Sequence, residues 1–185
     1  MNKKSTVKPK IIQVVGYKNT GKTTMTSALI AGLAAKGLKV AAIKHDGHDH
    51  FEMDQEGTDS YQFGKAGASA VVVVSHKRTA ILKQHTTGLE DMLGQLSDYD
   101  WIVIEGYKEA TYPKLVMVRE THDLTLANEL QHVVGIVFGS QELLDEVNVG
   151  AEGKNSLTTH DKAKFLFNEW ETIVEAVLRI NSTNS

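Results

Sequence analysis

The chain has 185 residues, 41% of them hydrophobic and 23% charged, and its formal net charge is -3 at pH 7. These values are typical of a globular protein and argue against binding to nucleic acid or to an anionic membrane through broad positive charge. The sequence has no cysteine, which excludes disulfides, zinc–thiolate sites and iron–sulfur clusters. Its apolar runs are too short to span a bilayer and it shows no signal-peptide pattern, so we expect a cytoplasmic protein.

The first predicted elements form a strand–helix–strand unit. Residues 1–9 contain several lysines and are expected to be a flexible tail, and the apolar run Ile11–Val15 predicts a buried strand. Apolar residues at helical spacing over Thr23–Lys36, followed by Gly37, predict a helix. Val40–Ile43 predicts the next strand, which should lie parallel to the first after a right-handed crossover.

The middle of the chain predicts a loop and four short elements. The polar, histidine-rich stretch His45–Gly57 predicts a loop, and Asp59–Ala66 predicts a short helix that ends before Gly67. The valine run Ala70–Val74 predicts a strand that is buried on both faces. A short extra strand is expected at Thr79–Leu82, and the spacing of Leu89, Met92, Leu93 and Leu96 predicts a helix.

The last part of the chain predicts three strands and a long helix. The strands are Trp101–Ile104, which ends at Glu105, then Leu115–Val118 and Val133–Phe138, and the helix runs from about Lys162 to Ile180. Strands that alternate with helices predict a three-layer α/β fold with a mainly parallel sheet. No internal repeat or linker divides the chain, so a single domain over residues 1–185 is expected.

A phosphate-binding loop is the most specific motif in the sequence. Gly16–Thr23 reads GYKNTGKT and matches the P-loop pattern G-x-x-x-x-G-K-[ST] between a predicted strand and a predicted helix. The glycines let backbone N–H groups approach phosphate oxygens, and the helix N-terminus favours the same negative charge. Lys22 is expected to bridge the β- and γ-phosphates, and the Thr23 hydroxyl to coordinate Mg²⁺. The motif predicts a P-loop NTPase fold and nucleotide binding through Gly16, Lys18, Asn19, Thr20, Gly21, Lys22, Thr23 and Thr24.

Two carboxylates are candidates for the Mg²⁺ site beside Thr23. Glu105 closes a predicted buried strand, where an acidic residue orders the Mg²⁺ shell in P-loop proteins, and it is also the candidate catalytic residue because it could polarise a water. Asp46 follows another predicted strand, and loops at the carboxyl ends of parallel strands share one edge of the sheet. Lys44 could face a phosphate at the same edge.

The loop from His45 to His50 contains three histidines and two aspartates and allows three interpretations. It could be a switch that responds to nucleotide or to a partner, a solvated loop, or a transition-metal site. Lys77 and Arg78 follow the valine-rich strand and could hold a further anion, although two solvated charges in a turn explain them equally well.

Two features of other nucleotide-binding proteins are missing. The guanine-reading motif N-K-x-D has no counterpart, since the only Asn-Lys pair, Asn2-Lys3, lacks the aspartate. The only arginines are Arg78, Arg119 and Arg179, and none is an evident arginine finger. At most slow intrinsic hydrolysis is therefore expected.

Four blocks in sequence order resemble the MobB family of molybdopterin-guanine dinucleotide biosynthesis adapter proteins. They are GYKNTGKTT of the P-loop, Ile43–Asp46 with the histidines that follow, Asp59-Ser60 before Ala66-Gly67-Ala68, and Trp101–Lys108. The resemblance implies a homodimeric, GTP-binding adapter with weak GTPase activity in molybdenum cofactor biosynthesis. It also implies assistance to the guanylyltransferase MobA, which attaches GMP to molybdopterin. The guanine preference comes from the resemblance alone.

The P-loop is also compatible with two other functions. One is a small-molecule kinase, although such kinases usually carry an arginine-bearing lid and arginine is scarce here. The other is a metallochaperone-type GTPase that would use the His45–His50 loop.

Overall fold

A computed structural model describes residues 8–47, 52–150 and 162–180. Contacts divide the chain into two compact units, one formed by residues 1–45 with 96–185 and the other by residues 46–95. The first unit carries the P-loop. Residues 1–7 of the predicted tail and residues 48–51 of the histidine-rich stretch His45–Gly57 lie outside the described part of the chain.

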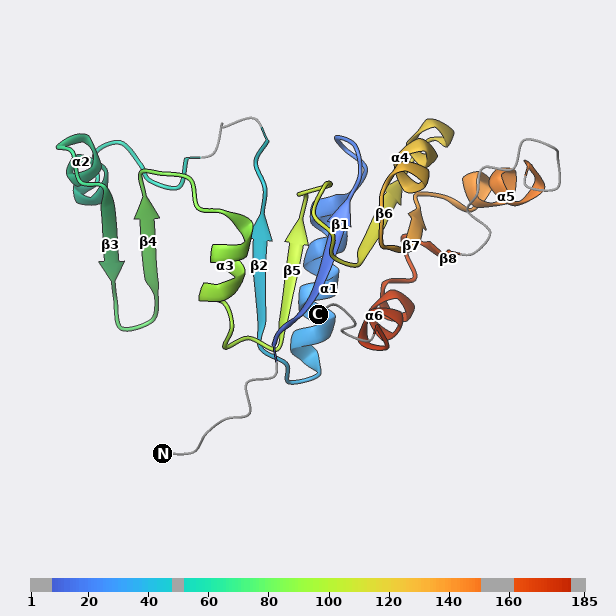
Figure 1. Ribbon diagram of the computed structural model, residues 1–185, viewed down its shortest axis with the longest axis horizontal. Helices are drawn as coiled ribbons and strands as arrows, with labels where there is room; N and C mark the ends of the chain where they lie inside the picture. Colours follow the sequence, from blue (N-terminus) through green and yellow to red (C-terminus); the bar gives the residue numbers. More distant parts are fainter. Residues whose placement is uncertain (1–7, 48–51, 151–161, 181–185) are drawn as a thin grey trace. The chain divides into compact units, whose positions relative to one another are not determined.

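The first unit contains a sheet of six parallel strands in the order β2-β5-β1-β6-β7-β8 (Figure 1). The strands are β1 Lys10–Val15, β2 Val40–Lys44, β5 Trp101–Glu105, β6 Lys114–Val118, β7 Val133–Phe138 and β8 Ala163–Leu166. Because the strands are parallel, their carboxyl ends meet at one edge, where the ligand crevice of such sheets lies. The predicted α/β class with a mainly parallel sheet is confirmed.

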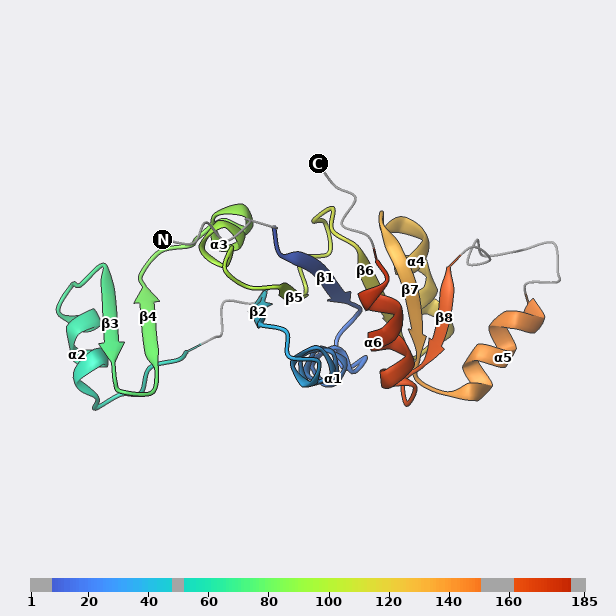
Figure 2. The ribbon, with the colours of Figure 1, turned by 90° about the horizontal axis from the view of Figure 1, so that it is seen from below.

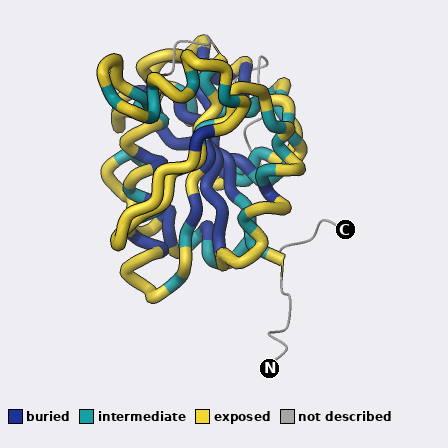
Figure 3. Tube along the Cα trace, turned by 90° about the vertical axis from the view of Figure 1, so that its left-hand side faces the viewer, coloured by how far each residue is buried: buried dark blue, intermediate teal, exposed yellow. Residues whose placement is uncertain are grey.

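Helices cover both faces of this sheet (Figures 1 and 2). Val14 belongs to a core cluster with side chains of α1, Lys22–Ala35, and α6, Trp170–Leu178. Its neighbour Val15 belongs to a second cluster with α4, Leu124–Glu129, and α5, Gln141–Gly150. The short 3-10 helix η1, Thr121–Asp123, precedes α4. Alternate strand residues thus fill two cores, one on each face of the sheet, which gives the three-layer architecture. The buried strand segments are dark blue in Figure 3.

The two helices on one face pack closely because α1 carries a glycine at the contact. A Cβ at Gly32 would lie 2.6 Å from Cγ2 of Val174 in α6. Both residues belong to the buried layer between these helices, Gly32 in α1 and Val174 at 3% exposure in α6. The absence of a side chain at Gly32 therefore sets how closely α6 approaches α1.

The second unit is an antiparallel hairpin with two short helices. Its elements are α2 Asp59–Lys65, β3 Ala70–Val74, β4 Thr79–Lys83 and α3 Leu89–Gln95, all of which were predicted. The prediction that Ala70–Val74 is buried on both faces is wrong. Val71 is 5% exposed, but Val72 and Val74 are 57% and 71% exposed. The strand pairs with β4 in a separate two-stranded sheet and is not a member of the parallel sheet.

The same difference bears on Lys77 and Arg78, which were candidates to hold a further anion. They lie between the two hairpin strands, and the Arg78 carbonyl accepts the Ser75 backbone N–H at 2.9 Å. This is the geometry of a tight turn with two charged residues.

The C-terminal region also differs from its prediction. The expected helix from Lys162 to Ile180 is the edge strand β8 followed by α6. Phe165 and Phe167 alternate as in a strand, and β8 pairs with β7 over Gly135 to Phe138. Helices α4 and α5 were not predicted. Within the described residues, no helix combines the length and the apolar character needed to cross a membrane.

Candidate functional site

The P-loop connects β1 to α1 at the carboxyl edge of the parallel sheet. A Cβ at Gly16 would lie 2.6 Å from Thr20 Oγ1 and 3.0 Å from Met117 Cβ, so only glycine fits without displacement. Gly21 is the N-cap of α1 with φ 90°, and a Cβ there would lie 3.0 Å from Cε2 of Phe167. Both motif glycines are thus required by the geometry of the loop, as the sequence pattern predicts.

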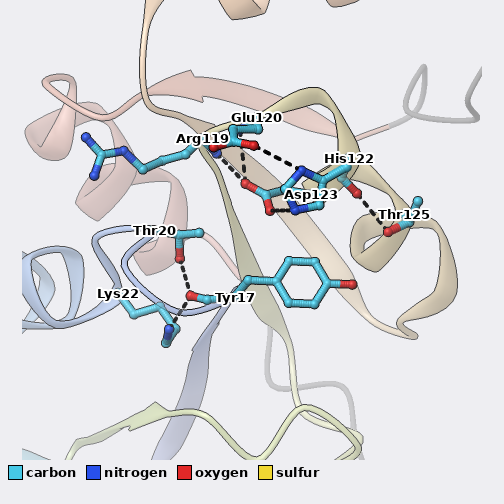
Figure 4. A network of polar contacts seen from close by, with 8 residues as sticks. All are labelled: Tyr17, Thr20, Lys22, Arg119, Glu120, His122, Asp123 and Thr125. Atoms are coloured by element: carbon cyan, nitrogen blue, oxygen red, sulfur yellow. Dashed lines mark hydrogen bonds and ion pairs between the residues drawn. The ribbon is translucent and has the colours of Figure 1, made fainter.

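The side chains of the loop converge on one backbone oxygen. Lys22 Nζ donates to the Tyr17 carbonyl at 2.6 Å, and Thr20 Oγ1 donates to the same oxygen at 2.9 Å (Figure 4). Burial lowers the pKa of Lys22, the Glu105 carboxylate opposes this, and the positive charges of Lys108 and Lys44 lower it further. Lys22 is therefore held in the loop near other positive charges. An anion bound there would reduce the repulsion between them.

Glu105 lies at the end of β5 and receives two hydrogen bonds on one carboxylate oxygen. Thr23 Oγ1 donates to Oε1 at 3.1 Å and Lys44 Nζ donates to it at 2.9 Å. Glu105 is 7% exposed, and Lys44 is its register neighbour in β2. A hydroxyl and a carboxylate oxygen at this separation form a donor set that suits Mg²⁺, which prefers hard oxygen ligands and is bound through one or two carboxylates with phosphates.

The turn after β5 is attached to the central strand β1. Gln13 is fully buried, and its Nε2 donates to the carbonyls of Gly106 at 3.0 Å and Tyr107 at 2.8 Å. The Gly106 N–H donates to the Val14 carbonyl at 3.0 Å. Gly106 and Tyr107 have positive φ values of 95° and 50°. Sequence reasoning missed Gln13, although a polar residue inside the run Ile-Ile-Gln-Val-Val is a visible signal.

The loop after β6 supports the P-loop from another side. The Arg119 guanidinium donates to the Asn19 carbonyl at 3.1 Å, and Asn19 has φ 64°. The buried Asp123 carboxylate accepts the backbone N–H groups of Arg119 and Glu120 at 2.7 and 3.0 Å. These residues were not predicted as part of the site, because nothing in the sequence shows which strand end neighbours the P-loop.

Tyr17 projects from the P-loop between two partners. Its ring stacks on His122 with centroids 5.7 Å apart, and Lys108 Nζ lies 4.6 Å from the Tyr17 centroid. His122 in turn lies between the carboxylates of Glu120 and Asp123 (Figure 4). Aromatic and cationic side chains therefore lie together beside Tyr17 of the P-loop. Such groups are typical partners of a nucleotide.

The predicted phosphate-binding residues, Gly16 and Lys18 to Thr24, lie together at this edge with Glu105. Their roles toward nucleotide and Mg²⁺ stay predictions. Asp46 belongs to the second unit, so its role as a metal ligand also stays a prediction. His48 and His50 lie outside the described residues, and within the described part no three potential metal ligands form a cluster.

A parallel sheet with this loop between its first strand and first helix, and with a carboxylate at the end of the adjacent strand, defines the P-loop α/β fold. A family model described as "MobB: Molybdopterin guanine dinucleotide synthesis protein B" matches residues 11–139. The chain belongs to the MobB family, which confirms the resemblance of the four sequence blocks.

Several known proteins are similar to this chain. The molybdopterin-guanine dinucleotide biosynthesis adapter protein of Haemophilus influenzae is 31% identical over 130 residues, covering 68% of this chain and 72% of that protein. A relative from Methanocaldococcus jannaschii is 35% identical over 144 residues, which are 75% of this chain but only 58% of the archaeal protein. The crystal structure of Bacillus subtilis MobB is 28% identical, with a TM-score of 0.71 over 91% of this chain and 96% of that one.

Proposed function

We propose that this chain is an adapter protein in molybdopterin guanine dinucleotide biosynthesis that binds GTP with Mg²⁺ at its P-loop. The observation that carries the proposal is the convergence of Lys22, Thr23 and Glu105 at the P-loop of a chain in the MobB family. The guanine preference, the partner MobA and its substrate molybdopterin come from the family resemblance. The cytoplasmic location stays a prediction from the sequence.

The residues of the site have distinct roles in this proposal. Backbone N–H groups of the loop would receive the phosphates, and Lys22 would exchange the Tyr17 carbonyl for the β- and γ-phosphates. Thr23 and Glu105 would hold Mg²⁺, which neutralises phosphate charge when bound. Glu105 would polarise a water for slow hydrolysis.

Thermal unfolding with Mg²⁺ and GTP, GDP or ATP tests the nucleotide assignment. A ligand at about 100 times its Kd stabilises by about 2.7 kcal/mol, which shifts the Tm of a chain of this size by roughly 5–10 °C. A shift with GTP and a smaller one with ATP supports the adapter function and justifies a binding assay with purified MobA. An equal or larger shift with ATP would instead favour the small-molecule kinase. Stoichiometric nickel or zinc binding that is lost on changing His45, His48 and His50 to alanine would favour the metallochaperone.

We also propose that the chain forms a homodimer through the exposed face of the hairpin. Val72 and Ile81 are directly opposite each other in the β3–β4 pair, and they are 57% and 60% exposed. Val74 lies two residues along the same face at 71% exposure. Adjacent exposed aliphatic side chains of this kind are typical of a surface that a partner covers.

Sedimentation velocity tests the dimer proposal with two variants of equal charge change. Ile81→Lys places a charge on the apolar face and should shift the protein toward monomer. Thr86→Lys adds the same charge at an exposed residue after β4 and should sediment as wild type does. Equal dimer content in both variants and in the wild type would refute this interface.

A further inference from the structure

More positive charge surrounds Glu105 than one carboxylate can neutralise. Lys44 Nζ contacts Oε1 at 2.9 Å, and Lys22 lies close enough to Glu105, Lys44 and Lys108 for all three to influence its pKa. Lys108 is further fixed over the Tyr17 ring at 4.6 Å. Lys44 and Lys22 near one buried carboxylate, with Lys108 near Lys22, make a site that favours a multiply charged anion.

Lys44 and Mg²⁺ would compete for the same oxygen. Thr23 Oγ1 and Lys44 Nζ both donate to Oε1 of Glu105, and Oε1 is the carboxylate oxygen beside the Thr23 hydroxyl. Two cations on one oxygen repel each other strongly in a partly buried site. With Mg²⁺ held by Thr23 and Glu105, the Lys44 ammonium would leave Oε1 and would be stabilised by a further anion beside this carboxylate.

The backbone of Lys44 is fixed at the end of β2, and its side chain is largely exposed apart from the ion pair with Glu105. Lys44 is paired with Glu105 in the β2–β5 ladder, and the next N–H, of His45, donates to the Glu105 carbonyl at 2.9 Å. The His45 ring also stacks on Tyr107 at 4.2 Å. The Lys44 side chain itself is 63% exposed. Strand β2 lies about 4.8 Å from its neighbour β5. The long Lys44 side chain at the end of β2 can therefore reach an anion that lies past the end of β5.

We propose that Lys44 determines the preference for a nucleoside triphosphate over a diphosphate. It pairs with Glu105 until Mg²⁺ takes Oε1, and it then contacts the terminal phosphate, which a diphosphate lacks. The inference rests on the proposed nucleotide site, but not on its preference for guanine.

Binding measurements on four forms of the full chain test this assignment. Titration calorimetry gives the Kd values of GTP and GDP with Mg²⁺ for the wild type, Lys44→Gln, Lys44→Arg and Lys39→Gln. Lys39 is an exposed lysine beside the amino end of the same strand, so Lys39→Gln is the charge-matched control. The ratio of the GDP to the GTP Kd should fall about tenfold in Lys44→Gln, as expected for one lost charged hydrogen bond. It should recover in Lys44→Arg and stay unchanged in Lys39→Gln.

A second measurement reads the competition with Mg²⁺ directly. Because Lys44→Gln removes the competing ammonium, GDP should reach half-maximal binding at a lower Mg²⁺ concentration than in the wild type. A wild-type GTP preference together with a wild-type Mg²⁺ requirement in Lys44→Gln would overturn the inference and leave the proposed function intact. Failure of the wild type to bind any of GTP, GDP, ATP or ADP would overturn the proposed function itself. Equal binding of ATP and GTP would favour the small-molecule kinase over the GTP-binding adapter, and the ratio of the ADP to the ATP Kd would then report on Lys44.

Discussion

Replacing Lys22 with alanine separates a role in ligand binding from a role in the fold. The side chain makes one hydrogen bond, to the Tyr17 carbonyl at 2.6 Å, and such a bond contributes about 0.5–1.5 kcal/mol net. Burial lowers the pKa of Lys22, so folding also carries an opposing desolvation cost that alanine removes. The two effects oppose each other, and we expect the free energy of unfolding to change by less than about 1 kcal/mol, or roughly 2–4 °C in Tm.

Nucleotide binding should respond far more strongly to the same substitution. A hydrogen bond to a charged group contributes about 1.5–3 kcal/mol, and Lys22 is expected to contact two phosphates. The loss corresponds to about a hundredfold or more in Kd, which calorimetry with GTP and Mg²⁺ would measure. Lys39→Ala, which removes an exposed lysine at the other edge of the sheet, is the control and should bind as wild type does. Wild-type GTP affinity in Lys22→Ala, or loss of its folded state, would refute this reasoning.

Three further substitutions test other parts of the structure. Glu105→Gln removes the carboxylate charge beside the Thr23 hydroxyl and should raise the Mg²⁺ concentration needed for GTP binding about tenfold or more. An unchanged Mg²⁺ requirement together with unchanged GTP turnover would argue against Glu105 as a Mg²⁺ and catalytic residue. Gly32→Ala should destabilise by about 1–3 kcal/mol through overpacking, because the new Cβ would lie 2.6 Å from Val174 Cγ2; denaturant unfolding of the double variant with Val174→Ala should show less than the summed loss. Burial lowers the pKa of Lys114 from 10.5, so the unfolded chain binds its proton more tightly and the contribution of Lys114 to stability rises as pH approaches 10.5. The unfolding free energy of the wild type minus that of Lys114→Met should therefore rise with pH over that range. A difference that stays constant would contradict the burial effect.

Much of the fold could be predicted because its signals are local. The run Ile11–Val15, the P-loop and the helix after it form one continuous pattern, and the structure places each where the pattern indicates. The errors concern pairing, which depends on residues far apart in the chain. A valine-rich run has the same composition in a buried sheet and in an exposed hairpin, so the sequence could not show that β3 pairs with β4 alone. The four-residue strand β8 was merged with α6 because a short edge strand carries little periodicity of its own.

The candidate site shows the same limit. The predicted phosphate-binding residues follow from the motif, and the candidate Glu105 follows from its position at a strand end. The hydrogen bonds from Lys44 to Glu105 and from Arg119 to Asn19 depend on the strand order β2-β5-β1-β6, which brings these strand ends together. A single sequence does not determine that order, so these partners could only be found in the structure.

The attachment of Gln13 to the turn after β5 has a consequence for the proposed GTP-binding function. In switch-type GTPases, segments that are ordered around the γ-phosphate are released on hydrolysis. Here the residues after Glu105 are held by two hydrogen bonds from Gln13 and one to Val14, independently of any phosphate. Hydrolysis would therefore leave this turn in place, and a partner could not read the nucleotide from it.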